Sequence, residues 1–319
     1  MIYLTANTCD LKMLWQIQVQ HFNFKRLGID LKDVYNLVVY SDIINDNYQK
    51  YADNSPANII FIKDNAFSRS YIPSIKPYAY KEFFKLNLHL ESEYVFYCDQ
   101  DVIFREIPNF SILNENKIYV SDTIGYIGAK YILSKGDKVF KDMCKIVGID
   151  EQLVIDNELK SGACQIYGRG LNVDYWDKVE RDSIQLYNDI NNIPKYFHSF
   201  FIKNGVPMHK DNMVQIWCAE MWATLWNIWL FGLDTEIHSE LNFTWASNGI
   251  DGYFDTKILH NTGLSNADKT NVFNKEDVGH TLIENIRSDI SIRENSCTFA
   301  YYVETLMAKL WVKQLYNSK

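Results

Sequence analysis

The sequence has no C-x-x-C pair, and its cysteines are too scattered to suggest a disulfide framework. The 319 residues contain six cysteines, each isolated along the chain: Cys9, Cys98, Cys144, Cys164, Cys218 and Cys297. Disulfide-rich secreted domains and structural zinc sites both use cysteines at short spacings. The N-terminus also lacks the pattern of a secretory leader. We therefore expect a reducing compartment, the cytoplasm, and no structural zinc.

Long hydrophobic runs, internal repeats and flexible linkers are missing as well. Even the apolar stretch 216–230 is interrupted by Glu220, Thr224 and Asn227, whereas a membrane span needs about 20 apolar residues. No linker rich in Pro, Gly and Ser divides the chain, which indicates one continuous domain. Hydrophobic residues make up 47% of the sequence and aromatic residues 15%, so a large core can be buried.

The first part of the chain reads as strand, helix, strand, helix, strand. Residues 1–7, 36–41 and 59–63 are short runs rich in β-branched and aromatic side chains, and Asp10 is placed to cap a helix after the first run. The segments between them have lengths that suit right-handed parallel crossovers. This order predicts the α/β architecture of a nucleotide-binding half.

The most informative stretch is Tyr94–Phe104 (YVFYCDQDVIF), an apolar run that carries Asp99 and Asp101. Its composition predicts a buried strand with the acids at the rim of a sheet, where open α/β sheets bind ligands. Two carboxylates at i and i+2 of an extended chain point the same way and can share one hard divalent cation. A solvated turn with no ligand is the alternative.

This run resembles the D-x-D strand of glycosyltransferases with the GT-A fold, in which an apolar pair, here Val102 and Ile103, follows the metal-binding acids. The resemblance implies an α/β fold, a Rossmann-like mixed sheet flanked by helices, as a single continuous domain with a C-terminal helical region. Residues 1–111 would form the half that binds the nucleotide sugar. Residues 112–319 would form the acceptor-binding half and the C-terminal helices.

A second motif, His260–Gly263 (HNTG), resembles the H-x-x-G motif of glycogenin-like retaining members of that group. It implies that His260 closes the metal shell begun by Asp99 and Asp101, and that Gly263 and a downstream lysine contact the diphosphate. Carboxylates with one imidazole suit Mn²⁺ or Mg²⁺. A histidine satisfied by a backbone carbonyl is the alternative for His260.

The chain departs from the H-x-x-G pattern three residues beyond the glycine. Asn266 stands where the lysine is expected, and Lys269 is the nearest substitute.

The resemblance also implies further contacts with the donor. The end of the first strand, Thr5, Ala6 and Asn7, would border the nucleoside. A helix predicted over Pro77–Leu90 follows Lys76, which would reach the diphosphate, with Lys81 and Lys85 as other candidates. Exposed lysines on helices are usually only solvated, so this role has a simpler alternative.

The same resemblance to GT-A enzymes makes three side chains of the second half candidates for contacts with the acceptor and the donor sugar. Glu220 lies at the start of an apolar helix whose tryptophans we assign to the core, and it would deprotonate the acceptor. Asp122, at the end of a strand predicted over 117–122, is the other candidate base. Gln165, in the small-residue segment 161–168, would contact the donor sugar, although that segment can equally be a tight turn.

The function implied is a transfer of a hexose such as glucose from a UDP-sugar to a hydroxyl. The overall pattern of SDTIGYIGAKYIL, SGACQIYG, IWCAEMWATLWNIWL and ILHNTG resembles phage and viral glycosyltransferases that modify hydroxymethylpyrimidines in DNA, including relatives of the base J enzyme. On that interpretation the enzyme works in the host cytoplasm. The basic and aromatic stretch 194–210 would then receive a flipped base. The net charge of -8 counts against a DNA partner.

Two other classes of function are left open. The acceptor can be a saccharide, a glycolipid or a protein with the same donor site, or the chain can be a non-catalytic nucleotide-binding module.

Overall fold

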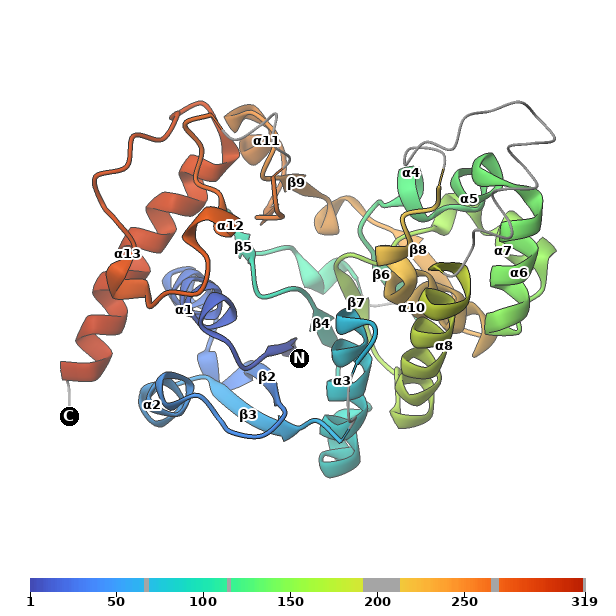
Figure 1. The fold of residues 1–319 in the computed structure, drawn as a ribbon, viewed down its shortest axis with the longest axis horizontal. Helices are drawn as coiled ribbons and strands as arrows, with labels where there is room; N and C mark the ends of the chain where they lie inside the picture. The colour runs from blue at the N-terminus through green and yellow to red at the C-terminus, as the bar shows by residue number, and fades with distance from the viewer. Residues whose placement is uncertain (66–68, 114–115, 192–212, 265–269, 318–319) are drawn as a thin grey trace. The chain divides into compact units, whose positions relative to one another are not determined.

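The computed structural model describes residues 1–65, 69–113, 116–191, 213–264 and 270–317 (Figure 1). The chain divides into two compact units. The first unit comprises Met1–Asn65, Val95–Asn114 and Ser239–Lys319, and the second comprises Ala66–Tyr94 and Glu115–His238. Each unit is described by itself below.

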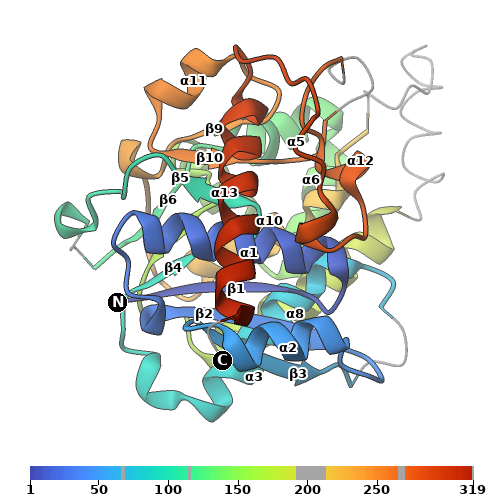
Figure 2. The ribbon, with the colours of Figure 1, turned by 90° about the vertical axis from the view of Figure 1, so that its left-hand side faces the viewer.

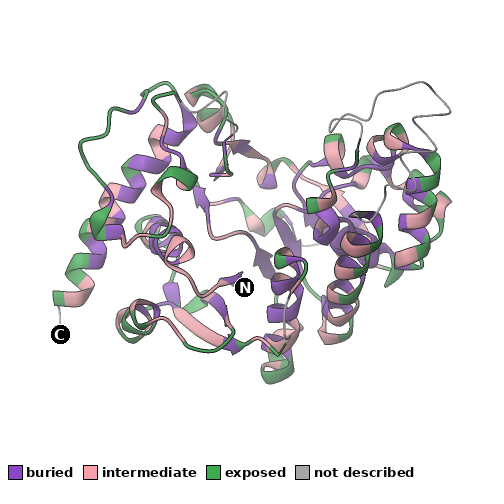
Figure 3. Ribbon diagram, in the orientation of Figure 1, coloured by how far each residue is buried: buried purple, intermediate pink, exposed green. Residues whose placement is uncertain are grey.

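Four parallel strands form the sheet of the first unit, in the order β3-β2-β1-β4. They are β1 (Ile2–Thr8), β2 (Val34–Tyr40), β3 (Asn58–Lys63) and β4 (Val95–Tyr97). The three strands predicted for the opening of the chain are confirmed, because buried β-branched and aromatic residues follow one another along β1 and β2 (Figure 3).

Helices complete the crossovers between these strands. α1 (Leu11–Arg26) follows β1, and α2 (Asp46–Asn54) follows β2. The predicted N-cap is confirmed, since the carboxylate of Asp10 accepts a hydrogen bond of 3.1 Å from the backbone N–H of Met13. The long C-terminal helix α13 (Cys297–Asn317) packs on α1 (Figure 2). The predicted C-terminal helical region is therefore present.

A second, three-stranded sheet in the first unit has the order β5-β10-β9. β10 (Ile258–His260) pairs antiparallel with β5 (Val102–Phe104) and parallel with β9 (Phe243–Trp245). The acid pair follows the end of a strand, as predicted, and Tyr94–Phe104 contributes one short strand to each of the two sheets. The chain leaves the first sheet after Tyr97, turns, and enters the other sheet at Val102, so the acids lie in a turn between two short strands.

The second unit holds three strands in the order β7-β6-β8, with β6 antiparallel to β7 and parallel to β8. They are β6 (Ile118–Val120), β7 (Ile166–Gly168) and β8 (Thr235–Ile237). Helix α8 (Val173–Asn191) packs against α3 (Ile75–Leu86) and α10 (Ala219–Leu230). The tryptophans of α10 are buried as predicted: Trp222, Trp226 and Trp229.

The helix predicted over Pro77–Leu90 corresponds to α3 and ends four residues earlier than expected. Pro77 lies in its first turn, and Tyr80, Phe83 and Phe84 are buried. Leu88, which an unbroken helix would place on the same face as Phe84, is 63% exposed. It falls in a 3₁₀ turn beyond the helix, where the helical spacing no longer applies.

The other helices of the described residues are α4 (Ile124–Ile127), α5 (Ala129–Lys135), α6 (Asp137–Val147), α7 (Glu151–Asp156), α11 (Ile250–Asp255) and α12 (Lys275–Val278). The 3₁₀ turns are Leu31–Asp33, Ile72–Ser74, Leu88–Leu90, Phe110–Ile112, Glu158–Lys160, Ile216–Cys218, Ser239–Leu241 and Ile283–Asn285. Among the described residues, none of the helices is both long and apolar enough to cross a bilayer. The α/β class, with mixed strands flanked by helices, is confirmed.

Candidate metal centre

The turn between β4 and β5 carries the acid pair, and hydrogen bonds from other residues of the first unit stabilise it. The backbone N–H of Val102 donates to the carbonyl oxygen of Asp99 at 3.3 Å, which closes the turn. The buried side-chain amide of Gln20, on α1, donates to the carbonyl oxygens of Asp99 at 2.8 Å and Val102 at 3.1 Å. The turn is therefore fixed by a helix about 80 residues earlier in the chain.

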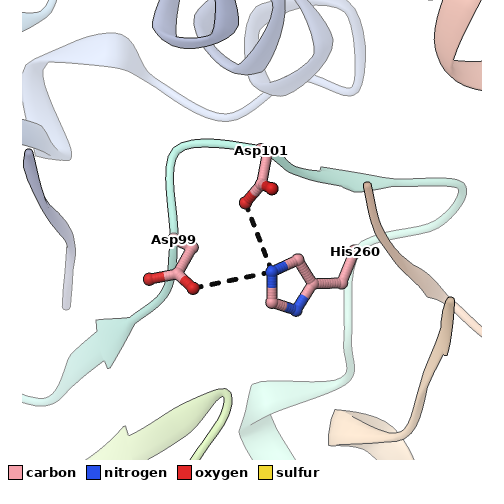
Figure 4. A group of neighbouring side chains, drawn as sticks. All are labelled: Asp99, Asp101 and His260. Carbon is pink, nitrogen blue, oxygen red and sulfur yellow. Dashed lines mark ion pairs between the residues drawn. The ribbon is translucent and has the colours of Figure 1, made fainter. Parts of the chain in front are cut away.

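His260 reaches the acid pair from the neighbouring strand. It is the last residue of β10, and its register partner on β5 is Val102, the residue after Asp101. Its Nε2 atom lies 3.5 Å from Oδ2 of Asp99 and 3.3 Å from Oδ1 of Asp101 (Figure 4). The imidazole stacks on Trp245, with ring centroids 5.7 Å apart and an interplanar angle of 25°. Strand pairing and stacking thus aim the ring at both carboxylates.

The three side chains predicted as metal ligands come together in the structure. One ligand atom from each of Asp99, Asp101 and His260 lies within 4.8 Å of the other two. Asp101 and His260 are 1% and 5% exposed, while Asp99 is partly exposed. Two carboxylates and one imidazole form a donor set suited to Mn²⁺ or Mg²⁺.

A cation that the sequence did not reveal lies beside the acid pair. The ammonium group of Lys275, the first residue of α12, pairs with Oδ2 of Asp101. Burial would raise the pKa of the Asp101 carboxyl, but the charge of Lys275 and the contact with His260 hold that pKa below its ordinary value. Lys275 is separated from Asp101 by 174 positions, so no local pattern could identify the pair.

The residues predicted to border the nucleoside are buried, and the polar side chains among them form hydrogen bonds with other residues of the first unit. Thr5, Ala6 and Asn7 are each 2% exposed. The Thr5 hydroxyl donates to the Gln20 amide oxygen at 3.3 Å, and the Asn7 amide donates to the Tyr48 hydroxyl at 2.8 Å. Their predicted contact with a nucleoside stays a prediction.

Gly263 has room for a side chain, because a Cβ there would meet only Glu276 at 3.5 Å or more. Its predicted role at the diphosphate stays a prediction. Lys269 and Asn266 lie outside the described residues, as does the whole of 194–210.

In the second unit, two predicted site residues meet. Nζ of Lys76 lies 3.7 Å from Oε2 of Glu220, and the hydroxyl of Thr224 donates to Oε1 at 3.2 Å. Glu220 is 9% exposed and lies in the first turn of α10. The Tyr71 hydroxyl accepts the Glu220 backbone N–H at 2.9 Å and donates to the carbonyl oxygen of Trp217. Burial and the Glu220 charge raise the pKa of Tyr71, which keeps it a neutral donor.

Asp122 and Gln165 occupy different environments in the same unit. Asp122 is exposed, and its Oδ1 accepts the backbone N–H of Ile124 at 3.1 Å at the start of α4. Gln165 is fully buried, and its backbone N–H donates to the Ser121 hydroxyl at 3.0 Å. Their predicted roles at the acceptor and sugar stay predictions.

The segment that precedes Gln165 passes too close to β6 for any side chain at Gly162. A Cβ there would lie 2.2 Å from the carbonyl oxygen of Ser121 and 2.6 Å from Cγ2 of Val120. We expect Gly162→Ala to lower the free energy of unfolding by about 1–3 kcal/mol, measured by thermal or denaturant unfolding. Gly125→Ala is the control, because a Cβ there meets nothing within 4 Å. Equal stability of the two variants would contradict the close approach.

We expect His260→Ala to weaken Mn²⁺-dependent binding of a UDP-sugar by more than about tenfold, because a metal ligand is lost. The melting temperature of the metal-free protein should change by only a few degrees. Calorimetry with and without Mn²⁺ measures both.

His21→Ala is the matched control for a core histidine. His21 is fully buried, its Nδ1 bonds the Tyr51 hydroxyl at 2.9 Å, and burial lowers its pKa to about 3. Its loss should lower stability equally with and without Mn²⁺. The same behaviour from His260→Ala would assign His260 to the core.

Comparisons with known proteins find glycosyltransferases at low similarity. The bifunctional glycosyltransferase WbbM shares 9% identity at a TM-score of 0.48, over 99% of this chain and 51% of that one. GlyE of Streptococcus pneumoniae TIGR4 shares 11% at a TM-score of 0.44, over 98% of this chain and 63% of that one. The galactosyltransferase LgtC, solved with donor and acceptor sugar analogues, shares 12% at a TM-score of 0.34, over 97% and 95%.

This chain therefore spans about half the length of the WbbM structure and less than two thirds of the GlyE structure. No protein-family model and no curated protein matches it. At these identities and TM-scores the likeness has no bearing on substrate or mechanism.

Proposed function

We propose that this chain is a metal-dependent glycosyltransferase that moves a hexose from a UDP-sugar to a hydroxyl acceptor. The observation that carries the proposal is the convergence of Asp99, Asp101 and His260 at the end of two neighbouring strands. Two carboxylates and an imidazole can hold a hard divalent cation and leave coordination positions for phosphate oxygens.

In the proposed transfer a nucleoside diphosphate leaves the sugar, and its negative charge is the reason for a bound cation. When bound, Mn²⁺ or Mg²⁺ supplies Lewis-acid stabilisation of the charge on the leaving diphosphate, worth several kcal/mol. Lys275 and His260 lower the pKa of Asp101, so its carboxyl group stays ionised and can bind a cation. Asp99 is partly exposed on the side open to solvent.

For the acceptor side we propose Glu220 as the base that takes the proton of the acceptor hydroxyl. Lys76, whose Nζ lies 3.7 Å from Oε2 of Glu220, is the proposed contact to the diphosphate of the donor. Asp122 is the second candidate base, and Gln165 the candidate contact to the sugar.

We propose two alternative classes of acceptor. A hydroxymethyl group on a pyrimidine of DNA is one candidate, and a saccharide, glycolipid or protein hydroxyl is the other. The net charge of -8 favours the second group.

Incubation with a panel of UDP-sugars tests the proposal. We expect UDP release that requires Mn²⁺ or Mg²⁺, is abolished by EDTA, and increases with the correct acceptor. Parallel reactions with hydroxymethylated DNA, unmodified DNA and simple saccharides separate the acceptor classes. Tight UDP-sugar binding without release in any reaction would favour a non-catalytic nucleotide-binding module, and no binding of any UDP-sugar would contradict the donor assignment.

A further inference from the structure

One tryptophan of the second unit has its indole ring in solvent. Trp217 is 64% exposed and lies in the 3₁₀ turn Ile216–Cys218, which leads into α10. A single exposed apolar side chain is ordinary on a protein surface, so the position of Trp217 must carry the argument. The other seven tryptophans of the chain are buried or half-buried: Trp15, Trp176, Trp222, Trp226, Trp229, Trp245 and Trp311.

Two tyrosines fix the backbone around Trp217. The Tyr131 hydroxyl accepts the backbone N–H of Gln215 at 3.0 Å. The Tyr71 hydroxyl donates to the carbonyl oxygen of Trp217 and accepts the backbone N–H of Glu220 at 2.9 Å. Tyr71 is 1% exposed, so this link is made inside the unit. The backbone position of Trp217 is therefore set relative to the first turn of α10.

The indole also contacts the ring of Tyr71. The two ring centroids are 5.9 Å apart with an interplanar angle of 82°, an edge-to-face arrangement that aromatic rings favour. Tyr71 in turn stacks on Tyr187 of α8, with centroids 4.6 Å apart and an angle of 20°. These contacts anchor the indole while most of its surface stays open to solvent. The result is a flat apolar ring presented on a rigid support.

Trp217 lies next to the residue that we propose as the acceptor base. Residues three positions apart lie on the same side of a 3₁₀ turn and of an α-helix, and Trp217 and Glu220 have this spacing. A pyranose has two kinds of surface, the C–H groups on the face of its ring and the hydroxyls at its edge. The C–H groups pack on the face of an aromatic ring, and a carboxylate accepts hydrogen bonds from hydroxyls.

An exposed indole also stacks on nucleobases, but two observations favour a saccharide. A base that is flipped out of DNA enters a snug pocket in which it stacks between side chains. The ring contact of Trp217 within the described part of the chain is Tyr71, which meets it edge to face and adds no second stacking surface. The net charge of -8 also disfavours a phosphate backbone.

We propose that Trp217 is the platform for a saccharide acceptor, which lies with one face of its ring on the indole and directs a hydroxyl to Glu220. This inference rests on the proposed function, because it takes Glu220 to be the base of the transfer. Trp217 is thus an acceptor-binding residue that selects a pyranose over DNA. No bond is made or broken at its side chain.

Iodide quenching of tryptophan fluorescence tests the platform without any turnover. The quenching that is lost in Trp217→Phe measures the contribution of Trp217. Glucose, galactose, N-acetylglucosamine and disaccharides of each are titrated with and without UDP and Mn²⁺, and hydroxymethylated single-stranded DNA is titrated in parallel. We expect at least one saccharide to protect Trp217 from iodide and the DNA to give no protection.

Acceptor kinetics with the protecting saccharide measure the role of Trp217 in transfer. We expect Trp217→Ala to raise the KM for that saccharide about tenfold, as the loss of one aromatic stacking contact would. Trp217→Phe keeps a flat ring and should retain most of the affinity. Trp217→Leu keeps apolar volume without a flat ring and should resemble Trp217→Ala. It replaces that variant if the alanine protein does not fold.

Phe231 provides a matched aromatic control. It is 42% exposed, and its ring meets that of Tyr175 edge to face, with centroids 5.6 Å apart. It follows the last residue of α10, eleven positions after Glu220, which is about 16 Å along a helix axis. Phe231→Ala should therefore leave the KM for the saccharide unchanged.

Protection by a saccharide, with a raised KM in Trp217→Ala, supports the platform. Protection by the DNA and by no saccharide would assign Trp217 to a nucleobase and overturn the proposal, and so would a lack of protection by every ligand. A saccharide that the wild type and Trp217→Ala glycosylate with equal KM would also overturn it, while the transferase itself would stand. Protection by a saccharide without UDP release in any reaction would contradict the transferase and leave the saccharide site in place.

Discussion

Asp101→Asn is expected to lower the Mn²⁺-dependent affinity for a UDP-sugar on the order of 100-fold or more, since changes outside the ligand shell alone cost 10–100-fold. The substitution removes the most buried anionic ligand of the centre. It also deprives Lys275 of its ion-pair partner, so that the ammonium opposes a divalent cation without compensation. Isothermal titration of the donor at saturating Mn²⁺ measures the loss.

The matched control is Asp182→Asn in the second unit. Asp182 is 5% exposed and pairs with Nζ of Lys178 at 2.7 Å, so it shares the burial and the lysine partner of Asp101 without the histidine. Its substitution should lower stability and leave donor affinity unchanged. A donor affinity of Asp101→Asn equal to that of the wild type would rule out a cation clamp at this carboxylate.

Local patterns were sufficient to predict the strands and the helix cap at the start of the chain. β1, β2 and β3 are continuous runs of residues that favour strands, and each lies within two residues of its predicted range. The cap at Asp10 depends on a side chain and a backbone group three residues apart. These features are determined by neighbours in the sequence, so the sequence alone is enough to locate them.

The break between β4 and β5 could not be predicted in the same way. Tyr94–Phe104 has strand-like composition on both sides of the acids, and composition does not distinguish one strand from two that belong to different sheets. The turn is specified by Gln20, whose side-chain amide bonds two carbonyl oxygens about 80 residues away. Such a partner becomes visible only when α1 has packed on the sheet.

The charges of the centre show the same limit. The D-x-D and H-x-x-G patterns, through the resemblance to GT-A glycosyltransferases, predicted which three side chains converge. Lys275 belongs to no motif, since it begins a helix of four residues after a segment without strong periodicity. Its contact with Asp101 depends on tertiary packing over 174 positions.

Glu220→Gln is expected to lower kcat by about 10²-fold or more while the affinity for the UDP-sugar stays near that of the wild type, as the loss of a general base requires. Glutamine keeps the shape of the side chain and can still accept the hydroxyl of Thr224, but it cannot take a proton or pair with Lys76. Transfer rates and calorimetric donor affinity, measured on one preparation, separate the two effects.

A purely structural glutamate would behave differently, and Glu180 provides the comparison. Its carboxylate pairs with Lys81 at 2.6 Å and Arg69 at 3.2 Å, so it resembles Glu220 in burial and in having a lysine partner. Glu180→Gln should lower the free energy of unfolding by about 1–3 kcal/mol, the cost of leaving charged hydrogen-bond partners unsatisfied, and leave kcat unchanged.

If Glu220→Gln shows the same loss of stability with near-normal turnover, Glu220 serves only to pair Lys76 at the start of α10. The proton of the acceptor must then pass to Asp122, or the reaction must proceed by a retaining mechanism that needs no protein base.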